Sequence, residues 1–246
     1  MIIYSTYNLK KLTENVKNKK VLILGSGPSA TEVDWELADY EKIVSTSFFY
    51  LNDKVLKMDL CHVSLSKLVN LKDERLLKFL RNNKKTTISF EPKISKFLSK
   101  KTGQKEEEII HYVKKSHNFY NSLDFKNFYD EFSKRIFFYR SHSGLEGLAG
   151  RIFWPIADSK PKTVYFCGLD GISKSPEKDP QNYFRNHRGT TDKHYTYESY
   201  KLSFEEYAKK MYTYALEKGI KVINLGKGKD YNLISPISMI YEKGEA

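Results

Sequence analysis

Short apolar runs recur along the chain, and each is bounded by charged, proline or glycine residues. They cover residues 19–25 (KKVLILG), 41–50 (EKIVSTSFFY), 58–65 (MDLCHVSL), 85–92 (KTTISFEP), 135–140 (RIFFYR), 162–171 (KTVYFCGLDG) and 220–228 (IKVINLGKG). Continuous runs of Val, Ile, Leu and aromatic residues of this length are typical of strands that are buried on both faces of a parallel sheet. The pattern therefore predicts a strand in each of these runs.

Segments with helical spacing of apolar residues lie between the predicted strands. They cover residues 68–83, 143–157 and 197–219, and residues 95–135 have a weaker helical tendency. Strands that alternate with helices predict an α/β fold, here a Rossmann-like and mostly parallel sheet with flanking helices. Residues 1–246 are interpreted as one domain. Within it, residues 171–200 are polar and lack periodicity, which is typical of an inserted lid.

Glycine marks the carboxyl ends of three predicted strands. These turns are GSGPS at 25–29, GLDG at 168–171 and GKG at 226–228, and a fourth polar turn, RSHSG, lies at 140–144. Ligands of parallel sheets bind at the carboxyl ends of the strands, so we expect the four turns to converge on one crevice. Glycine lets a backbone approach a ligand closely, and a helix that follows the turn points free N–H groups at an anion.

The first turn matches the loose dinucleotide-binding pattern through Gly25, Gly27 and Ala30. An NAD site of this kind also needs an acidic residue about twenty residues later, at the end of the second strand, to bind a ribose. That strand end reads STSFF at 45–49 and contains no acid. No GK[ST] phosphate-binding motif follows the turn either. The sequence therefore disfavours both NAD binding and a Walker-type nucleotide site.

The charge balance bounds the partners. Lys and Arg total 42 against 30 Asp and Glu, which gives a net charge of +12, and such a field attracts nucleic acid, anionic membrane surfaces or phosphorylated small molecules. The lysines are mixed with acids and no nucleic-acid-binding motif is present, so we expect no nucleic acid. Contact with an anionic membrane surface and a homo-oligomer both stay open.

The apolar runs are too short to cross a bilayer, and the N-terminus lacks a secretory signal, so a cytoplasmic protein is expected, peripheral at the inner membrane at most. Cys61 and Cys167 lie in apolar runs, which predicts buried free thiols. No Cys/His cluster has zinc spacing, and no D-x-D motif stands at a strand end, so we expect no metal.

The order of the motifs resembles the bacterial sialyltransferases of glycosyltransferase family 42. GSGPS, STSFFYLND, RSHSG, GLD and a His-Tyr pair before a long helix follow one another over most of residues 20–225. The family has G-N-G-P-S, C-N-Q-F-Y-F-x-D, R-x-T-S-G, S-G-I-D and His-Tyr in the same order. The resemblance implies a metal-independent, cofactor-free glycosyltransferase. Such an enzyme transfers sialic acid or a related acidic sugar from a CMP donor to a glycan acceptor with inversion, in lipopolysaccharide or capsule biosynthesis.

The resemblance also implies the residues of the site. It assigns His194 as the general base and Arg140 as a second catalytic residue near donor and acceptor. His187 is the competing histidine. The residues implied to bind the nucleotide or the donor are Gly25, Ser26, Gly27, Ser29, Ser47, Ser64, Ser143, Gly144, Gly168, Leu169, Asp170, Tyr183, Arg185 and Arg188.

This chain departs from the family at several of these positions. Ser26, Ser47 and Ser64 stand where the family has Asn, and the Tyr that follows the G-I-D turn is missing. Tyrosines of the family's lid contact the leaving phosphate, a role that falls here to Tyr183 or to Arg185 and Arg188. The GPS and G-x-D turns also occur in hydroxymethylpterin pyrophosphokinase-like proteins, which are related to motility accessory factors. Diphosphate transfer and a non-catalytic nucleotide-binding module are therefore the alternatives.

Overall fold

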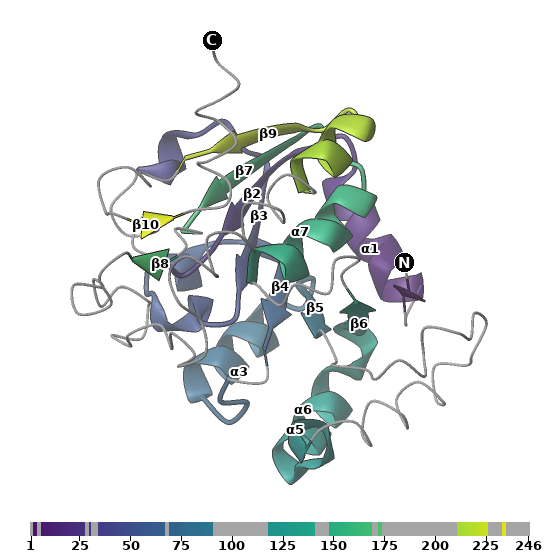
Figure 1. Cartoon of the computed structure of the whole chain (residues 1–246). Coiled ribbons are helices and arrows are strands. Elements are labelled where there is room, and N and C mark those ends of the chain that lie inside the picture. Colours follow the sequence, from purple (N-terminus) through teal and green to yellow (C-terminus); the bar gives the residue numbers. More distant parts are fainter. Residues whose placement is uncertain are drawn as a thin grey trace.

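An eight-stranded sheet forms the centre of the structure, a computed structural model (Figure 1). Its strands, in spatial order, are β1 (Ile2–Ile3), β6 (Ile136–Arg140), β5 (Thr87–Phe90), β4 (Leu60–Leu65), β3 (Lys42–Thr46), β2 (Lys20–Leu24), β7 (Thr163–Cys167) and β9 (Lys221–Asn224). The strands from β6 to β9 in this order are parallel, whereas β1 is antiparallel to β6. The structure describes residues 2–3, 6–27, 30, 34–66, 69–90, 118–140, 148–168, 172–173, 211–225 and 233–234.

The strand order creates a switch point between β2 and β7. From β2 the chain moves outward through β3, β4 and β5 to β6, and then returns to the opposite side of β2 to form β7. Connections that leave a sheet in opposite directions from two adjacent strands open a crevice at their carboxyl ends, where ligands bind in this class of fold. The predicted Rossmann-like, mostly parallel sheet is confirmed.

All seven predicted strands are present, but one is shorter than its apolar run. β3 stops at Thr46, and the aromatic end of the run forms a turn and a 3₁₀ helix, η2 (Phe49–Leu51). Burial explains the difference, because Phe49 is fully buried and its ring meets that of Phe79 edge to face at 4.9 Å. These aromatic residues leave the strand direction to fill the core below a helix.

Helices cover both faces of the sheet. On one face lie α1 (Thr6–Val16), α7 (Leu148–Asp158) and a helical segment at 211–217, and α1 runs alongside α7 (Figure 1). Their apolar residues, among them Leu12 and Phe153, pack on Val21, Ile23 and Val44 of the strands. This side is called the α1/α7 face below.

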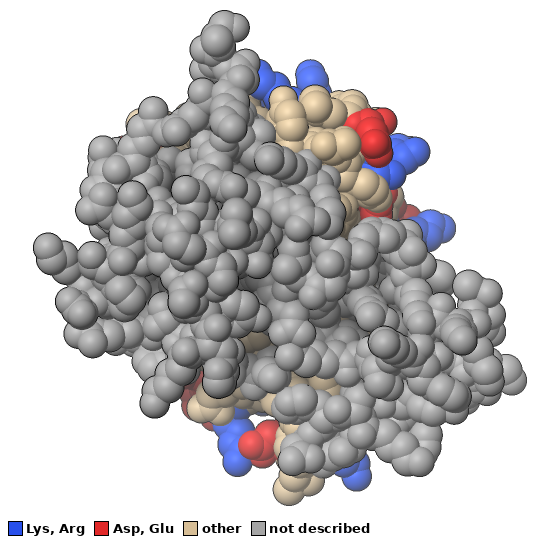
Figure 2. Space-filling view, viewed as in Figure 1, with Lys and Arg blue, Asp and Glu red and all other residues tan. Residues whose placement is uncertain are grey.

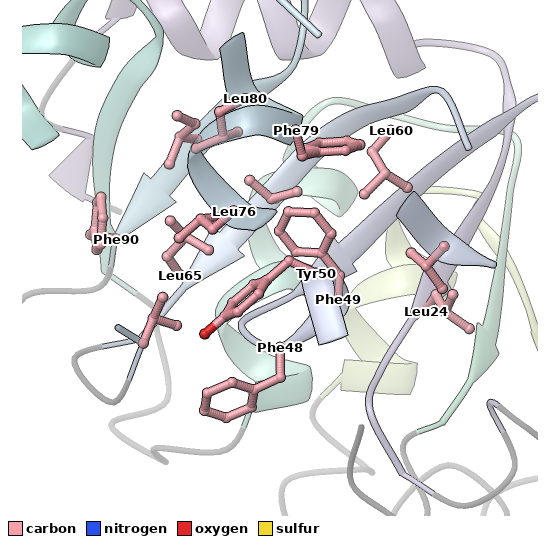
Figure 3. Close-up of a cluster of buried hydrophobic side chains, with 14 of the residues drawn as sticks. Leu24, Phe48, Phe49, Tyr50, Leu60, Leu65, Leu76, Phe79, Leu80 and Phe90 are labelled. Atoms are coloured by element: carbon pink, nitrogen blue, oxygen red, sulfur yellow. The ribbon is translucent and has the colours of Figure 1, made fainter. Parts of the chain in front are cut away.

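The opposite face is covered by α3 (Glu74–Asn82), α5 (Asn118–Asn121) and α6 (Leu123–Phe132). Figure 3 shows how the side chains of α3 meet the aromatic residues after β3. The labelled residues are Leu24, Phe48, Phe49, Tyr50, Leu60, Leu65, Leu76, Phe79, Leu80 and Phe90. Two separate cores therefore hold the sheet, which fixes the direction in which each strand side chain points.

The helix predicted over residues 68–83 begins later than its apolar spacing suggests. Asp73 is the N-cap of α3, and its carboxylate accepts a hydrogen bond from the Arg75 backbone N–H at 2.9 Å. Asp is a favoured N-cap because its side chain satisfies a backbone donor that the first turn leaves free. Residues before Asp73 therefore belong to the connection from β4.

The sequence pattern did not predict every element. β1 and α1 at the N-terminus were missed, and so was a short antiparallel ladder of β8 (Ile172–Ser173) with β10 (Leu233–Ile234). β8 falls at the start of the predicted lid, and residues 174–200 of the lid lie outside the described residues. Within the described part of the chain, no helix combines the length and the apolar character that crossing a bilayer requires.

Candidate functional site

Two glycine turns close on each other at the switch point. The Gly25 N–H donates to the Cys167 carbonyl at 2.7 Å, and the Gly27 N–H donates to the Gly168 carbonyl at 2.8 Å. These bonds extend the pairing of β2 with β7 beyond both strands and bring the ends of the two turns together. We call Gly25, Ser26, Gly27 and Gly168 the glycine corner.

Gly168 is required at its position for two reasons. Its φ of +73° lies in the left-handed region, which L side chains rarely adopt. A Cβ on Gly168 would also lie 2.7 Å from the Gly25 carbonyl oxygen and 2.8 Å from the Ala30 Cβ. The close packing of the two turns therefore depends on the absence of a side chain, as expected where a backbone must approach a ligand.

The end of β3, next to the glycine corner, carries hydroxyl groups and no carboxylate. The Ser45 hydroxyl donates to the Leu24 carbonyl at 2.9 Å, on the neighbouring strand. The Ser47 hydroxyl accepts from the Ser66 N–H at 2.9 Å and reaches the Ser64 carbonyl at 3.4 Å. Ser47 thus joins the ends of β3 and β4, and its hydrogen is engaged with the backbone. The described end of β3 therefore offers no acidic residue to bind a nicotinamide ribose.

A second set of polar side chains lies on the α1/α7 face of the central strands. Thr46, Ser64 and Ser89 occupy neighbouring strands in direct register, because Ser64 pairs with both Thr46 and Ser89. All three are buried. Side chains alternate along a strand, so Thr46 shares the face of Val44, which belongs to the core below α1 and α7. We call these three residues the hydroxyl row.

His62 lies on β4, two residues before Ser64 of the hydroxyl row, and is fully buried. Its Nδ1 lies 3.0 Å from the Thr87 hydroxyl, its Nε2 lies 3.1 Å from the Ser89 hydroxyl, and its ring stacks on Phe137. Burial lowers the pKa of His62 to about 3, against a smaller raising effect of a Thr87 backbone hydrogen bond. His62 is therefore neutral at physiological pH and is unsuited to be a general base near pH 7.

The two cysteines of the chain lie in strands β4 and β7. Cys61 and Cys167 are buried free thiols, as predicted. Burial raises the pKa of Cys61 to about 12, so its reactive thiolate is scarcely formed near neutral pH. Among the described residues, no group of His, Cys, Asp and Glu is arranged to hold a metal ion.

Several ion pairs of the described residues lie on the surface. Examples are Lys19 with Glu41 at 2.8 Å and Arg81 with Glu131 at 2.7 Å, and these side chains are exposed. Figure 2 shows basic and acidic side chains next to one another at the rim of the described surface. The charges are therefore interspersed there, as the sequence predicted.

The structure brings together part of the predicted site. Gly25, Gly27 and Gly168 meet in the glycine corner beside Ser26, and Ser47 meets the backbone of Ser64. The residues that lie outside the described part of the chain are Ser29, Ser143, Gly144, Leu169, Asp170, Tyr183, Arg185, Arg188 and His194. The RSHSG turn after Arg140 and the GKG turn also lie outside it, so the convergence of all four turns stays a prediction.

Arg140 lies at the carboxyl edge but far from the glycine corner along the sheet. It is the last residue of β6, and its backbone pairs with Ile2 of β1. Four strand spacings of about 4.8 Å separate β6 from β2, so the two strand ends are about 19 Å apart. An Arg140 that acts on a ligand in the glycine corner must reach across β5, β4 and β3.

Sequence reasoning missed Thr46, Ser89 and His62 as members of the site region. Each of them stands in an apolar run, where a single polar residue is compatible with an ordinary buried strand. The register of parallel strands groups Thr46 with Ser89, and that register depends on long-range pairing. Thr46, Ser64 and Ser89 each occupy one of the last two positions of a strand, a signal that becomes readable only once the strand ends are known.

Comparison with known proteins gives structural neighbours only. No protein-family model matches the sequence, and no curated protein matches it significantly. The sialyltransferase CstII from Campylobacter jejuni, in complex with cytidine-5'-monophosphate, is 18% identical, with 85% of this chain and 80% of that chain covered and a TM-score of 0.43. The sialyltransferase CST-II in complex with a trisaccharide acceptor and CMP is 18% identical, with 89% and 86% covered and a TM-score of 0.44.

A third solved structure, the apo form of an alpha-2,3-sialyltransferase from Campylobacter jejuni, is 15% identical over 88% of this chain and 80% of that chain, with a TM-score of 0.42. All three TM-scores lie below 0.5. This likeness therefore assigns neither an activity nor a ligand to the chain.

Proposed function

We propose that the protein is a glycosyltransferase that transfers an acidic sugar, sialic acid or a related one, from a CMP-activated donor to a glycan acceptor. The observation that carries the proposal is the glycine corner at the switch point, next to a strand end that has serines in place of the acid of NAD-binding folds. The ordered GSGPS, STSFFYLND, RSHSG and GLD motifs, with the His-Tyr pair, favour a cytidine nucleotide over other phosphorylated ligands.

The proposed chemistry needs few groups. The glycine corner brings main chain close to the nucleotide, and the helix predicted after Pro28 offers N–H groups to a phosphate. His194 removes the proton of the acceptor hydroxyl, because a histidine with an ordinary pKa is matched to proton transfer near pH 7. Arg185 and Arg188 of the predicted lid neutralise the leaving phosphate, and direct displacement inverts the anomeric centre. In this proposal, catalysis requires neither a metal nor a cofactor.

A thermal-shift panel with CMP, CDP, UDP, GDP, ATP and NAD tests the nucleotide specificity. A ligand at a hundred times its dissociation constant stabilises a protein by about 2.7 kcal/mol, so CMP or CDP should raise the melting temperature by several degrees and NAD should not. Gly27→Val should abolish the shift, because a side chain in the turn blocks close approach of the backbone. A shift with NAD alone would overturn the proposal.

Diphosphate transfer to a pterin is the alternative with the same scaffold, since its donor also presents phosphates to a glycine turn. The panel separates the two proposals. Binding of ATP without binding of CMP favours diphosphate transfer, because such an enzyme needs a nucleoside triphosphate as donor. Binding of CMP without turnover of any CMP-sugar favours a non-catalytic nucleotide-binding module.

A further inference from the structure

The hydroxyl row lies next to the glycine corner and extends from it across β3, β4 and β5. β2 and β3 are in register up to Leu24 beside Ser45, so the next residues along are Gly25 and Thr46. From Thr46 the row proceeds through Ser64 to Ser89. Strands that are buried on both faces usually carry continuous apolar side chains, so three aligned small hydroxyl residues are unusual. They lie towards the carboxyl ends of β3, β4 and β5, in line with the glycine corner at the end of β2.

Thr46 gives an independent reason to expect a ligand there. Its side chain is 1% exposed, and its hydroxyl has no hydrogen-bond partner in the described part of the chain. A buried hydroxyl without a partner typically costs about 1–3 kcal/mol of stability. By contrast, the nearby hydroxyls of Ser45, Ser47, Thr86, Thr87 and Ser89 all have partners.

The hydrogen bonds behind Ser89 fix the direction in which its hydroxyl points. The Thr87 hydroxyl donates to the Cys61 carbonyl at 3.1 Å, so it accepts the hydrogen of His62 Nδ1. A neutral imidazole carries one hydrogen, and His62 Nε2 must therefore accept. The Ser89 hydroxyl is then the donor to Nε2, at 3.1 Å. Its oxygen retains only lone pairs for any further partner.

We infer that the hydroxyl row binds the sugar ring of the donor through its neutral hydroxyl groups, with Ser89 as an obligate acceptor and Thr46 as a second partner. The inference rests on the proposed function, and it names which part of the donor meets these strands. A sugar hydroxyl can donate to Ser89. The ionised phosphates and the carboxylate of the donor have no hydrogen to give, and neutral His62 supplies no opposite charge. Ser89 therefore selects a partner group that carries a hydrogen, such as a sugar hydroxyl, whereas the Thr46 hydroxyl can donate as well as accept.

Calorimetric titration with CMP and with a fluorinated, hydrolysis-resistant CMP-sialic acid separates binding of the nucleotide from binding of the sugar. Thr46→Val and Ser89→Ala should each weaken binding of the donor analogue about fivefold, which is about 1 kcal/mol, and leave the affinity for CMP unchanged. A donor analogue that lacks the sugar hydroxyl bound by Ser89 should bind to wild type more weakly than the complete donor does. The Ser89→Ala variant should bind the two donors with equal affinity.

Thr86→Val is the matched control, since it removes a buried threonine hydroxyl whose partner is known. That hydroxyl donates to the Leu60 carbonyl at 2.7 Å, at the amino end of β5. Thr86→Val should lower the melting temperature without changing the preference for donor over CMP. Thr46→Val should reduce the preference for donor over CMP without lowering the melting temperature. It removes a hydroxyl that has no partner among the described residues, and it changes the shape of the side chain little.

The outcomes distinguish failure of the proposed function from failure of the sugar-binding role of the hydroxyl row. If wild type binds neither CMP nor the donor analogue, the proposed function fails, and this inference fails with it. If wild type binds both but Thr46→Val and Ser89→Ala keep the wild-type preference for the donor, only the inference on the row is overturned. A Thr46→Val protein as destabilised as Thr86→Val would show that the Thr46 hydroxyl stabilises the fold, which also overturns it.

Discussion

His62 links two strands through side-chain hydrogen bonds and takes no part in the proposed chemistry. Its two ring nitrogens hold the hydroxyls of Thr87 and Ser89 on the neighbouring strand, and its ring packs on Phe137. The sequence analysis did not place it in the site, because a lone histidine in an apolar run has no recognisable partner. The structure shows that its partners are also strand residues, so it orients Ser89 without being accessible itself.

The lowered pKa of His62 predicts a specific sensitivity to acid. The unfolded chain takes up a proton near the ordinary value of 6.5, whereas the folded protein resists it down to about 3. The free energy of unfolding should therefore fall as the pH drops below about 6.5, by as much as about 1.4 kcal/mol per pH unit until about pH 3. Urea denaturation of wild type and His62→Gln between pH 7 and pH 4 measures this. If the two proteins lose stability in parallel, His62 is not responsible.

The closure of the two turns on each other can be tested with a pair of glycines. Gly168 and Gly219 both have a positive φ, of +73° and +68°, but a Cβ on Gly219 would meet no heavy atom of the described residues within 4 Å. Gly219→Ala should cost about 1–2 kcal/mol for the backbone conformation alone. Gly168→Ala carries the same cost and must also push apart the two turns.

Urea denaturation should therefore show that Gly168→Ala has a lower free energy of unfolding than Gly219→Ala. The expected difference is about 1–3 kcal/mol, the usual cost of overpacking. Equal stability of the two variants would mean that the glycine corner can spread without penalty. The account of a tightly closed corner would then be wrong.

At the scale of the element, the strands were the most predictable feature and the ends of elements the least. Runs such as KKVLILG and TVYFC are apolar on both faces because helices cover both faces of the sheet. The position at which β3 ends could not be predicted, since Phe48, Phe49 and Tyr50 favour a strand locally. They leave it because the core below α3 can bury them. The start of α3 at its Asp73 cap was readable in the sequence, but the apolar spacing before it obscured the signal.

At the scale of the whole molecule, the glycine turns were predictable as ligand contacts, but their grouping was not. GSGPS and GLDG are separated by more than a hundred residues, and they meet only because the chain returns from β6 to the other side of β2. The same crossover leaves Arg140 at the far side of the sheet from the glycine corner. Motif order suggested a single site for all of them, whereas the strand order separates the backbone of Arg140 from the two turns.

Release of CMP from CMP-sialic acid, measured with galactoside acceptors for wild type, His194→Ala and His187→Ala, tests the central claim most directly. A positioned general base contributes about 10²- to 10⁴-fold, so His194→Ala should lose that factor in rate while its affinity for CMP changes little. The acidic limb of the wild-type pH profile should disappear in the same variant, and His187→Ala should behave like wild type. A silent His194→Ala beside a damaged His187→Ala would contradict the assignment of the base. If wild type releases no CMP, the protein is not the glycosyltransferase proposed here.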